Sequence, residues 1–329
     1  KGVIGMSTRT SALDEDEDFI ERLFTASTHD YLLFFTNTGR VYCERVHEIP
    51  DMGRAAKGRS IANLLELQSN ENVAALIRIN AQSENGLDTT WEQDQCLFFA
   101  TRKGTVKQTE LSQFANIRRG GIIAIKIDEG DLLIDVKLTT HGDDVVLITR
   151  QGMSIRFHED DVRRMGRATT GVRGIRLSDG DEVVAAAVVE KDASLLVAGD
   201  RGIGKRTDFE EYRVQARGGK GIITMKTGEK TGDVIGALTV KDGDEIMLIT
   251  TGGQMVRTSV NYIREIGRNT MGVRLINLDE EDRLQAIAPV VKEDDDDEDE
   301  NQLKLDVEIN NPDTPASPQP LSKETEEEV

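Results

Sequence analysis

The chain has 329 residues, of which 37% are apolar, so it is long enough for two domains or for one large repeat domain with a substantial core. Its 60 acidic residues outnumber its 41 basic residues, for a net charge of −19, but residues 293–329 alone hold 15 acidic and 2 basic residues and leave the first 292 residues near balance. The absence of about 18 consecutive apolar residues, a signal-peptide layout or a CxxC pair argues against membrane and disulfide-stapled secreted proteins and favours the cytoplasm. Because the chain begins at Lys1 without an initiator Met, we expect a fragment or a processed chain.

An apolar run that ends in a polar turn and a glycine recurs five times along the chain. The five copies lie at residues 31–39, 96–104, 145–152, 195–202 and 246–253, and their closing glycines are 65, 48, 50 and 51 residues apart. A second glycine follows each closing glycine after 19 residues, or 17 in the second copy, and precedes another apolar segment. A further apolar run follows an acidic residue later in each copy. These short runs, rich in Val, Ile, Leu and Phe, predict about four strands per repeat with hairpin turns at the first glycines.

The N-terminus matches the middle of a repeat. Residues 1–6 align with residues 220–225, and residues 18–24 occupy the place of a later apolar run, so we expect a sixth repeat whose first half is missing. Four-stranded repeats of about 50 residues suit radial blades. The predicted fold is therefore an all-β, six-bladed, propeller-like domain over residues 1–292 with an incomplete first blade, and an open spiral remains an alternative to a closed ring. The insertion at 80–93 predicts a surface loop, and the acidic, proline-containing residues 293–329 predict a disordered tail.

No catalytic constellation accompanies these repeats. The sequence has no phosphate-cradling loop with a following Lys-Ser/Thr, and no nucleophile elbow. The four histidines, His29, His47, His141 and His158, lack metal-ligand spacing. We therefore expect no catalytic residues, no metal and no cofactor in this chain.

Positive charge, in contrast, recurs in phase with the second glycines. Arginine forks match phosphate oxygens, and glycines let a backbone approach a phosphate, so a basic loop on each blade predicts a belt that follows a DNA backbone. The alternative is that these bases are solvated or pair with neighbouring acids such as Asp160 and Asp161. Basic residues also follow the first, hairpin-turn glycines, and Lys205 is one of them. The candidate DNA-binding residues are Lys1, Arg54, Lys57, Arg59, Lys107, Arg118, Arg119, Arg156, Arg167, Arg173, Arg206, Gln215, Arg217, Gly218, Gly219, Lys220, Gly221, Arg257, Arg268 and Arg274.

Several of these segments resemble the C-terminal domain of the A-subunit family of DNA gyrase. Residues 215–221, Gln-Ala-Arg-Gly-Gly-Lys-Gly, resemble its gyrase box, with Ala216 where a base is expected, and residues 39–42, 57–65, 165–177 and 267–273 are also similar. The resemblance places the family's main box in the first blade, where only Lys1 and Gly2 remain, so whether residues 215–221 replace it stays open.

The resemblance implies a six-bladed β-pinwheel that wraps double-stranded DNA and presents a segment for strand passage in ATP-dependent negative supercoiling. It implies partnership with the gyrase B protein and a second copy of the gyrase A protein in a heterotetrameric type IIA topoisomerase, which uses ATP and Mg²⁺ through its other parts. The expected location is the cytoplasm, on the chromosome and not at a membrane.

Three other functions remain open. The related topoisomerase IV protein, whose domain usually has fewer blades, presents DNA for decatenation. A protein-interaction propeller predicts apolar patches on the rim, and a stand-alone propeller enzyme predicts catalytic residues. The acidic tail either aids solubility or folds back onto the basic rim.

Overall fold

The computed structural model describes residues 26–51, 60–84, 87–279 and 281–290, and these residues form short antiparallel strands and single 3-10 turns. Sheet 1 holds β1 (Tyr31–Thr36), β2 (Arg40–Arg45), β3 (Val73–Ile79) and β8 (Ile122–Ile123). Sheet 2 holds β6 (Gln95–Thr101), β7 (Thr105–Glu110), β9 (Leu133–Thr140) and β12 (Val172–Arg173). Sheet 3 holds β10 (Asp144–Thr149), β11 (Met153–His158), β13 (Val183–Val188) and β16 (Ile222–Ile223). Sheet 4 holds β14 (Ala193–Gly199), β15 (Ile203–Asp208), β17 (Val234–Lys241) and β20 (Val273–Arg274), and sheet 5 holds β18 (Glu245–Thr250), β19 (Met255–Ser259) and β21 (Leu284–Val290).

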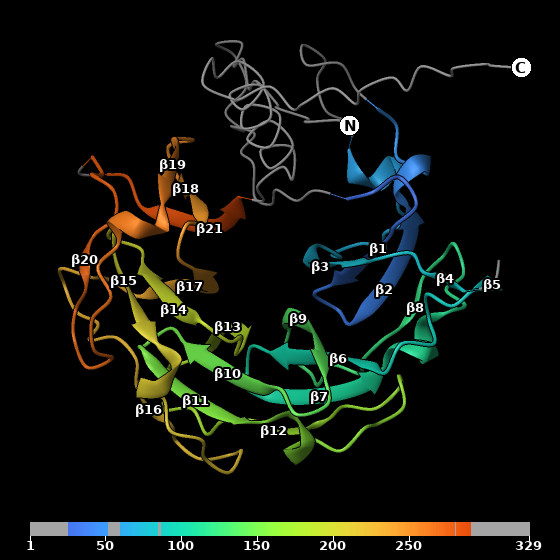
Figure 1. Cartoon of the computed structure of the whole chain (residues 1–329), viewed down its shortest axis with the longest axis horizontal. Helices are drawn as coiled ribbons and strands as arrows, with labels where there is room; N and C mark the ends of the chain where they lie inside the picture. Colours follow the sequence, from blue (N-terminus) through green and yellow to red (C-terminus); the bar gives the residue numbers. More distant parts are fainter. Residues whose placement is uncertain (1–25, 52–59, 85–86, 280, 291–329) are drawn as a thin grey trace, which may run out of the picture. The chain divides into compact units, whose positions relative to one another are not determined.

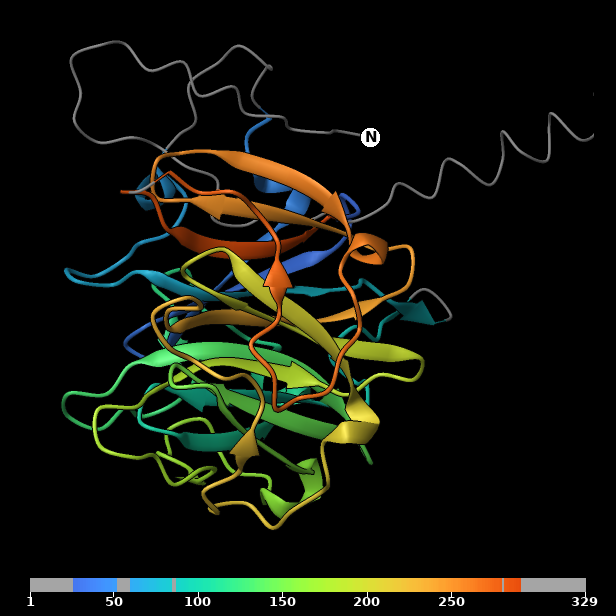
Figure 2. The ribbon, with the colours of Figure 1, turned by 90° about the vertical axis from the view of Figure 1, so that its left-hand side faces the viewer.

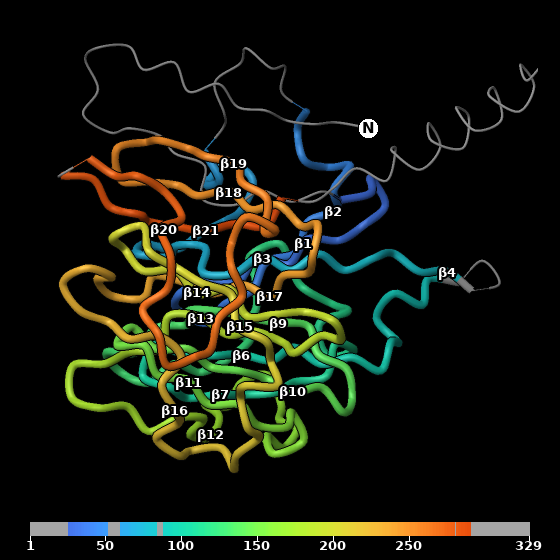
Figure 3. The backbone as a smooth tube through the Cα atoms, turned by 60° about the vertical axis from the view of Figure 1, so that its left-hand side comes forward, coloured from blue at the N-terminus to red at the C-terminus, as the bar shows by residue number. Residues whose placement is uncertain are grey.

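Each four-stranded sheet takes its outermost strand from the following repeat. In sheet 3 the order from inside to outside is β13-β10-β11-β16, and β16 lies 64 residues after the end of β11. Figure 1 shows β8, β12, β16 and β20 along the outer side of the sheets, and Figure 3 shows β12, β16 and β20 from another direction. In Figure 2 the orange segment that contains β20 lies across the outside of the yellow strands of sheet 4. The loop that leads to each outer strand therefore belongs to one repeat and covers the edge of another.

The described residues form five blades, which corrects the predicted number of six. The described residues contain five sheets with the repeat pattern, the last of which has three strands. The predicted incomplete blade at residues 1–25 and the predicted tail at 293–329 lie outside the described residues.

Each central strand is buried on both faces, which explains why its sequence is a continuous apolar run. Because successive side chains of a strand point to opposite faces, Val145 and Leu147 of β10 pack in one cluster with sheet 2, and Val146 and Ile148 pack in the next with sheet 4. Four such clusters lie between consecutive sheets, and a fifth covers the face of sheet 1 that is turned away from sheet 2. The sheets thus pack in series in chain order.

The predicted hairpin turns are present. In the third repeat the Gly152 N–H donates to the Thr149 carbonyl at 3.0 Å, and Gly152 has a φ of +78°. A Cβ there would lie 2.1 Å from the Met225 carbonyl oxygen, because the segment that follows β16 packs directly against this turn.

The remaining elements connect the strands. Five 3-10 turns follow the second strands of the sheets: η1 (Val46–Glu48), η3 (Leu111–Phe114), η4 (Glu159–Asp161), η5 (Phe209–Glu211) and η6 (Val260–Tyr262). Another, η2 (Ile61–Asn63), lies between β2 and β3. The insertion forms the small hairpin of β4 (Ser83–Glu84) and β5 (Leu87–Asp88), and Trp91 stacks edge-on against Tyr31 with ring centroids 5.2 Å apart. Among the described residues no helix is long and apolar enough to cross a membrane.

Candidate nucleic-acid interface

The basic loops predicted from the sequence follow the outer edges of the sheets. After η4, η5 and η6 the chain runs beside the second strand of the preceding sheet, through the parallel bridges Gln108–Arg164, Arg156–Val214 and Arg206–Glu265, and then forms the outer strand. Sheets 2, 3 and 4 therefore each carry one equivalent loop along their outer edge, and we call these outer edges together the perimeter. Of the predicted residues, Lys1, Arg54, Lys57 and Arg59 lie outside the described residues.

One group of predicted residues is exposed on these loops. Arg118 and Arg167, from consecutive loops, line one shallow depression. The Arg119 side chain is 86% exposed, with its Nε 3.5 Å from a carboxylate oxygen of Glu66. The exposed loop and outer-strand residues are Arg118, Arg119, Arg173, Lys220 and Arg274, and Arg257 is exposed on β19 of sheet 5. Arg257 forms an ion pair with Glu245, and Arg274 donates to the Asn277 side chain at 3.1 Å.

Two loop arginines are held by backbone carbonyls rather than by carboxylates. The Arg217 Nε donates to the Asp161 carbonyl at 2.8 Å and its Nη1 to the Arg173 carbonyl at 3.0 Å. The Arg268 Nη1 donates to the Ile223 carbonyl at 3.1 Å. A carbonyl orients a guanidinium without neutralising it, so these arginines keep a net charge for an anion. Of the acids suggested as partners, Asp161 accepts from Arg217 through its backbone carbonyl.

Two other predicted arginines are structural. Arg156 binds Asp144 through Nε at 2.7 Å and donates through Nη1 to the Phe209 carbonyl at 2.8 Å, which ties sheet 3 to η5. Arg206 binds Asp242 and donates to the Ile263 carbonyl at 2.9 Å. Their side chains are 15% and 14% exposed. Both guanidinium groups are largely buried and bind partners within the chain, which corrects their place among the exposed candidates.

Lys107 is also not a surface residue, contrary to its place among the candidates. Its side chain is fully buried, and its ammonium donates to the Ala124 carbonyl at 2.6 Å and to the Arg167 carbonyl. Burial, followed by the charge of Arg167, lowers the pKa of Lys107 to about 7. Lys205 repeats the arrangement two sheets later with the carbonyls of Gly267 and Arg268, and burial lowers its pKa to about 8. Both lysines therefore fasten the backbone of a loop that carries a candidate arginine.

Packing explains the last glycine of the box-like segment, and hydrogen bonds hold the backbone of the other two. Gly221 has a φ of +76°, and a Cβ there would lie 2.2 Å from the Ser154 carbonyl oxygen of β11. The Gly218 N–H donates to the Gly174 carbonyl at 2.6 Å, and the Gly219 carbonyl accepts from the Arg176 N–H at 2.8 Å. The Gln215 backbone N–H donates to the Arg156 carbonyl, and its buried Nε2 has no hydrogen-bond partner in the described structure. The segment is thus shaped first by the outer edge of sheet 3, and Lys220 is its exposed base.

Sequence reasoning missed two further rows of bases. Arg163, Arg213 and Arg264 begin the three loops, each eight residues before the second glycine, and are exposed. Lys126, Arg176 and Lys226 follow the outer strands, are exposed, and donate their backbone N–H to the next loop, at Thr169, Gly219 and Thr270. Within the described ranges none of these six side chains has an intramolecular ion pair. The sequence could have revealed them, because each row occupies the same position in successive repeats.

With this geometry in view, comparisons with known proteins decide the family. The family model described as the DNA gyrase C-terminal domain, beta-propeller, matches residues 30–80, 97–140, 143–190, 193–241 and 244–290, one stretch for each sheet. The chain belongs to this family. The DNA gyrase A protein of Escherichia coli strain K12 is 44% identical over 294 residues, which cover 88% of this chain and 33% of that protein. The DNA gyrase A protein of Mycolicibacterium smegmatis is 43% identical over 293 residues, covering 88% and 34%.

Solved structures of the DNA gyrase C-terminal domain family and its relatives have the same architecture. A DNA gyrase A C-terminal domain matches with a TM-score of 0.69 and 26% identity, covering 81% of this chain and 84% of that one. The C-terminal domain of a DNA topoisomerase IV matches with a TM-score of 0.71 and 28% identity, covering 85% and 84%. The chain spans about one third of the length of the curated relatives it matches.

Proposed function

We propose that the perimeter formed by the outer-strand loops binds the backbone of double-stranded DNA and wraps it around the successive sheets. One observation carries the proposal: bases occur at equivalent places on consecutive loops, as in Arg163, Arg213 and Arg264, and their side chains face solvent without an ion pair in the described structure. Repeated charge at a repeated position suits a ligand that is itself periodic, such as a phosphate backbone.

The chemistry of the loops favours contact with DNA phosphates rather than with the edges of the nucleobases. Arg217 and Arg268 are oriented by carbonyls and retain their charge. The described residues include no α-helix that enters a major groove, which is the usual route to base readout. Binding through the backbone is independent of sequence, and contacts on several sheets favour bent DNA.

In the whole protein we propose the role of the gyrase A protein. The domain would present a wrapped segment for strand passage during ATP-dependent negative supercoiling, in a heterotetramer with the gyrase B protein and a second copy of the gyrase A protein. ATP and Mg²⁺ would be bound elsewhere in that assembly. The proposed location is the cytoplasm, on the chromosome.

Binding of the full chain to linear duplexes tests the DNA-binding part. We expect two unrelated sequences of equal length to bind with similar affinity, and affinity to rise with duplex length until the perimeter is filled. A steep loss of affinity with salt should accompany binding. No binding at about 50 mM salt, where phosphate contacts are strong, would overturn the proposal and favour a protein-interaction role.

A second candidate function is DNA presentation for decatenation, the role that the resemblance implies for topoisomerase IV. It is favoured by the structural match to that enzyme's C-terminal domain and by the five sheets of the described residues, fewer than the six expected for gyrase. Presentation without wrapping would leave the linking number of bound circular DNA unchanged, so the two roles are separable.

A further inference from the structure

The turn η4 buries a carboxylate where three of the four equivalent turns bury an apolar side chain. The first residue of η4 is Glu159, which is 1% exposed. The same position is occupied by Leu111 in η3, Phe209 in η5 and Val260 in η6, all buried. Neither carboxylate oxygen of Glu159 makes a hydrogen bond of normal geometry in the described structure. A buried carboxylate without such partners destabilises a fold unless something else compensates it.

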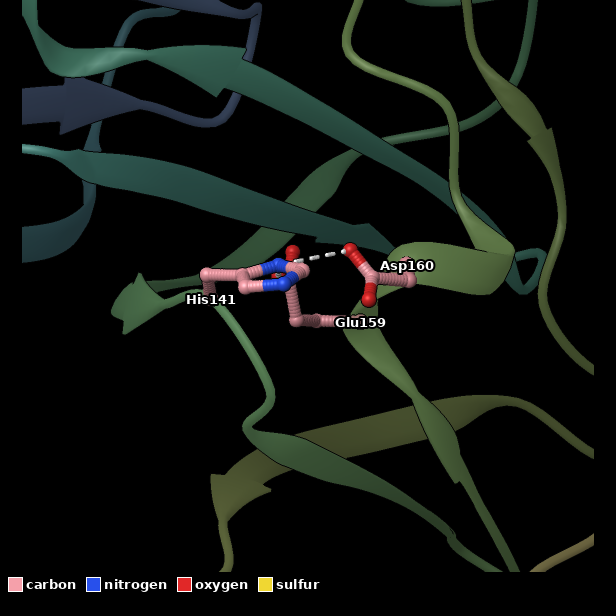
Figure 4. A group of neighbouring side chains, drawn as sticks. All are labelled: His141, Glu159 and Asp160. Atoms are coloured by element: carbon pink, nitrogen blue, oxygen red, sulfur yellow. Dashed lines mark hydrogen bonds and ion pairs between the residues drawn. The ribbon is translucent and has the colours of Figure 1, made fainter.

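Two exposed side chains complete a cluster around this carboxylate. His141 comes from the loop between β9 and β10, and Asp160 follows Glu159 in η4 (Figure 4). The His141 Nδ1 lies 3.1 Å from the Asp160 Oδ1 and 3.7 Å from the Glu159 Oε1. One ligand atom from each residue can be chosen so that all three lie within 4.8 Å of one another.

The segments that carry the cluster are already joined to each other. The Glu159 backbone N–H donates to the Asp143 carbonyl at 2.9 Å, so the loop of His141 is held against η4 independently of the three side chains. A site built on such fixed segments needs little reorganisation to bind an ion.

We propose that His141, Glu159 and Asp160 bind a divalent transition-metal ion, with Zn²⁺ the best fit. Ligands about 2.1 Å from a tetrahedral zinc lie about 3.4 Å from one another, and the two measured separations from His141 lie on either side of that value. An imidazole with two carboxylates suits zinc, cobalt or nickel better than Mg²⁺ or Ca²⁺, which prefer oxygen ligands alone. Three protein ligands leave a fourth position for water. The proposal revises the sequence-based expectation that the histidines bind no metal, and it does not depend on DNA binding.

The competing account is that Glu159 is neutral. Burial, followed by the charge of Asp160, raises its pKa, and the backbone N–H of Gly142 partly opposes this shift. A protonated Glu159 beside a His141–Asp160 ion pair would explain the cluster without a metal. The two accounts differ in whether transition-metal ions stabilise the chain through these three side chains.

Zinc titration of the full, metal-free chain separates them. Calorimetry and thermal unfolding would be followed with ZnCl₂ alone, and MgCl₂ would serve as the control ion. We expect one zinc per chain in the micromolar range or tighter, a rise in Tm with Zn²⁺, and no rise with Mg²⁺. Glu159→Gln and His141→Asn should each weaken zinc binding at least about 10-fold. His158→Asn is the matched control, because His158 pairs with Asp144 outside the cluster, and it should bind zinc normally.

Glu159→Leu guards against simple misfolding. It restores the apolar residue of the neighbouring turns, so we expect a higher Tm in the absence of metal together with loss of the zinc-dependent rise. Absence of any zinc-dependent rise in the unsubstituted chain would overturn the proposal in favour of a neutral Glu159. Zinc binding that Glu159→Gln and His141→Asn leave unchanged would overturn it as well, since the ion would then lie elsewhere.

Discussion

Replacing the exposed basic side chains of one outer-strand loop should weaken DNA binding without affecting the fold. Arg213, Lys220 and Lys226 lie before and after the outer strand of sheet 3, all are exposed, and none has an ion pair within the described ranges. Each contact with a phosphate contributes about 0.9 to the slope of log K against log salt. We therefore expect each single change to alanine to lower affinity about 8-fold at about 0.1 M salt, and the triple variant to lower the slope by about 2.7.

The assay is fluorescence anisotropy with one duplex at several salt concentrations, followed by thermal unfolding of each variant. Lys137→Ala is the matched control: it also removes one positive charge, but Lys137 lies on the inner strand β9, 3.1 Å from Asp135. Its salt slope should equal that of the unsubstituted chain. A triple variant with an unchanged slope, or a control that loses as much as a single loop variant, would refute the assignment of the loops as phosphate contacts.

Two further predictions concern stability. Gly221→Ala should destabilise the domain by about 2–4 kcal/mol, because its φ is +76° and its Cβ would meet the Ser154 carbonyl, while Gly228→Ala, with open space around it, should cost little; urea unfolding measures both, and equal losses would contradict the packing argument. For Lys107 the folded-state pKa of about 7 lies below the ordinary 10.5, so protonation favours unfolding, and the stability of the chain relative to Lys107→Met should rise with pH between about 7 and 10 by about 1 kcal/mol per unit. A pH-independent difference in urea unfolding would show that the ammonium stays charged on its carbonyls.

The local sequence pattern predicted the strands well because each strand is a short apolar run that ends at a turn residue. The apolar run of β10 and the turn at Gly152 are visible as a continuous Val-Val-Leu-Ile segment followed by a glycine, and both occur as predicted. The predicted number of blades was wrong because a sequence repeat does not coincide with a sheet: each four-stranded sheet takes its outer strand from the following repeat. The two-residue strand β16 is assigned to its sheet by pairing with β11, a contact between distant segments that no local pattern states.

The candidate interface was predicted as a set of loops but not residue by residue. Composition marks Lys107 and Lys220 equally as bases near glycine, yet the first is buried and the second exposed. Which face of a strand a base occupies follows from the register: Lys107 stands at the position where β2 has Tyr42 and β11 has Ile155, both buried. Gly221 was ascribed to phosphate approach, and the structure adds a packing requirement there, because a Cβ would lie 2.2 Å from the Ser154 carbonyl oxygen.

Chiral wrapping of DNA around the perimeter changes the linking number of a closed circle, so the linking number reports wrapping itself. The full chain would be bound to nicked plasmid, the nick sealed with ligase, the protein removed, and the topoisomers separated on a gel. If the perimeter wraps DNA, we expect a linking-number shift proportional to the amount of bound chain, and a smaller shift for the triple loop variant at equal occupancy. Saturating binding with no shift would contradict wrapping.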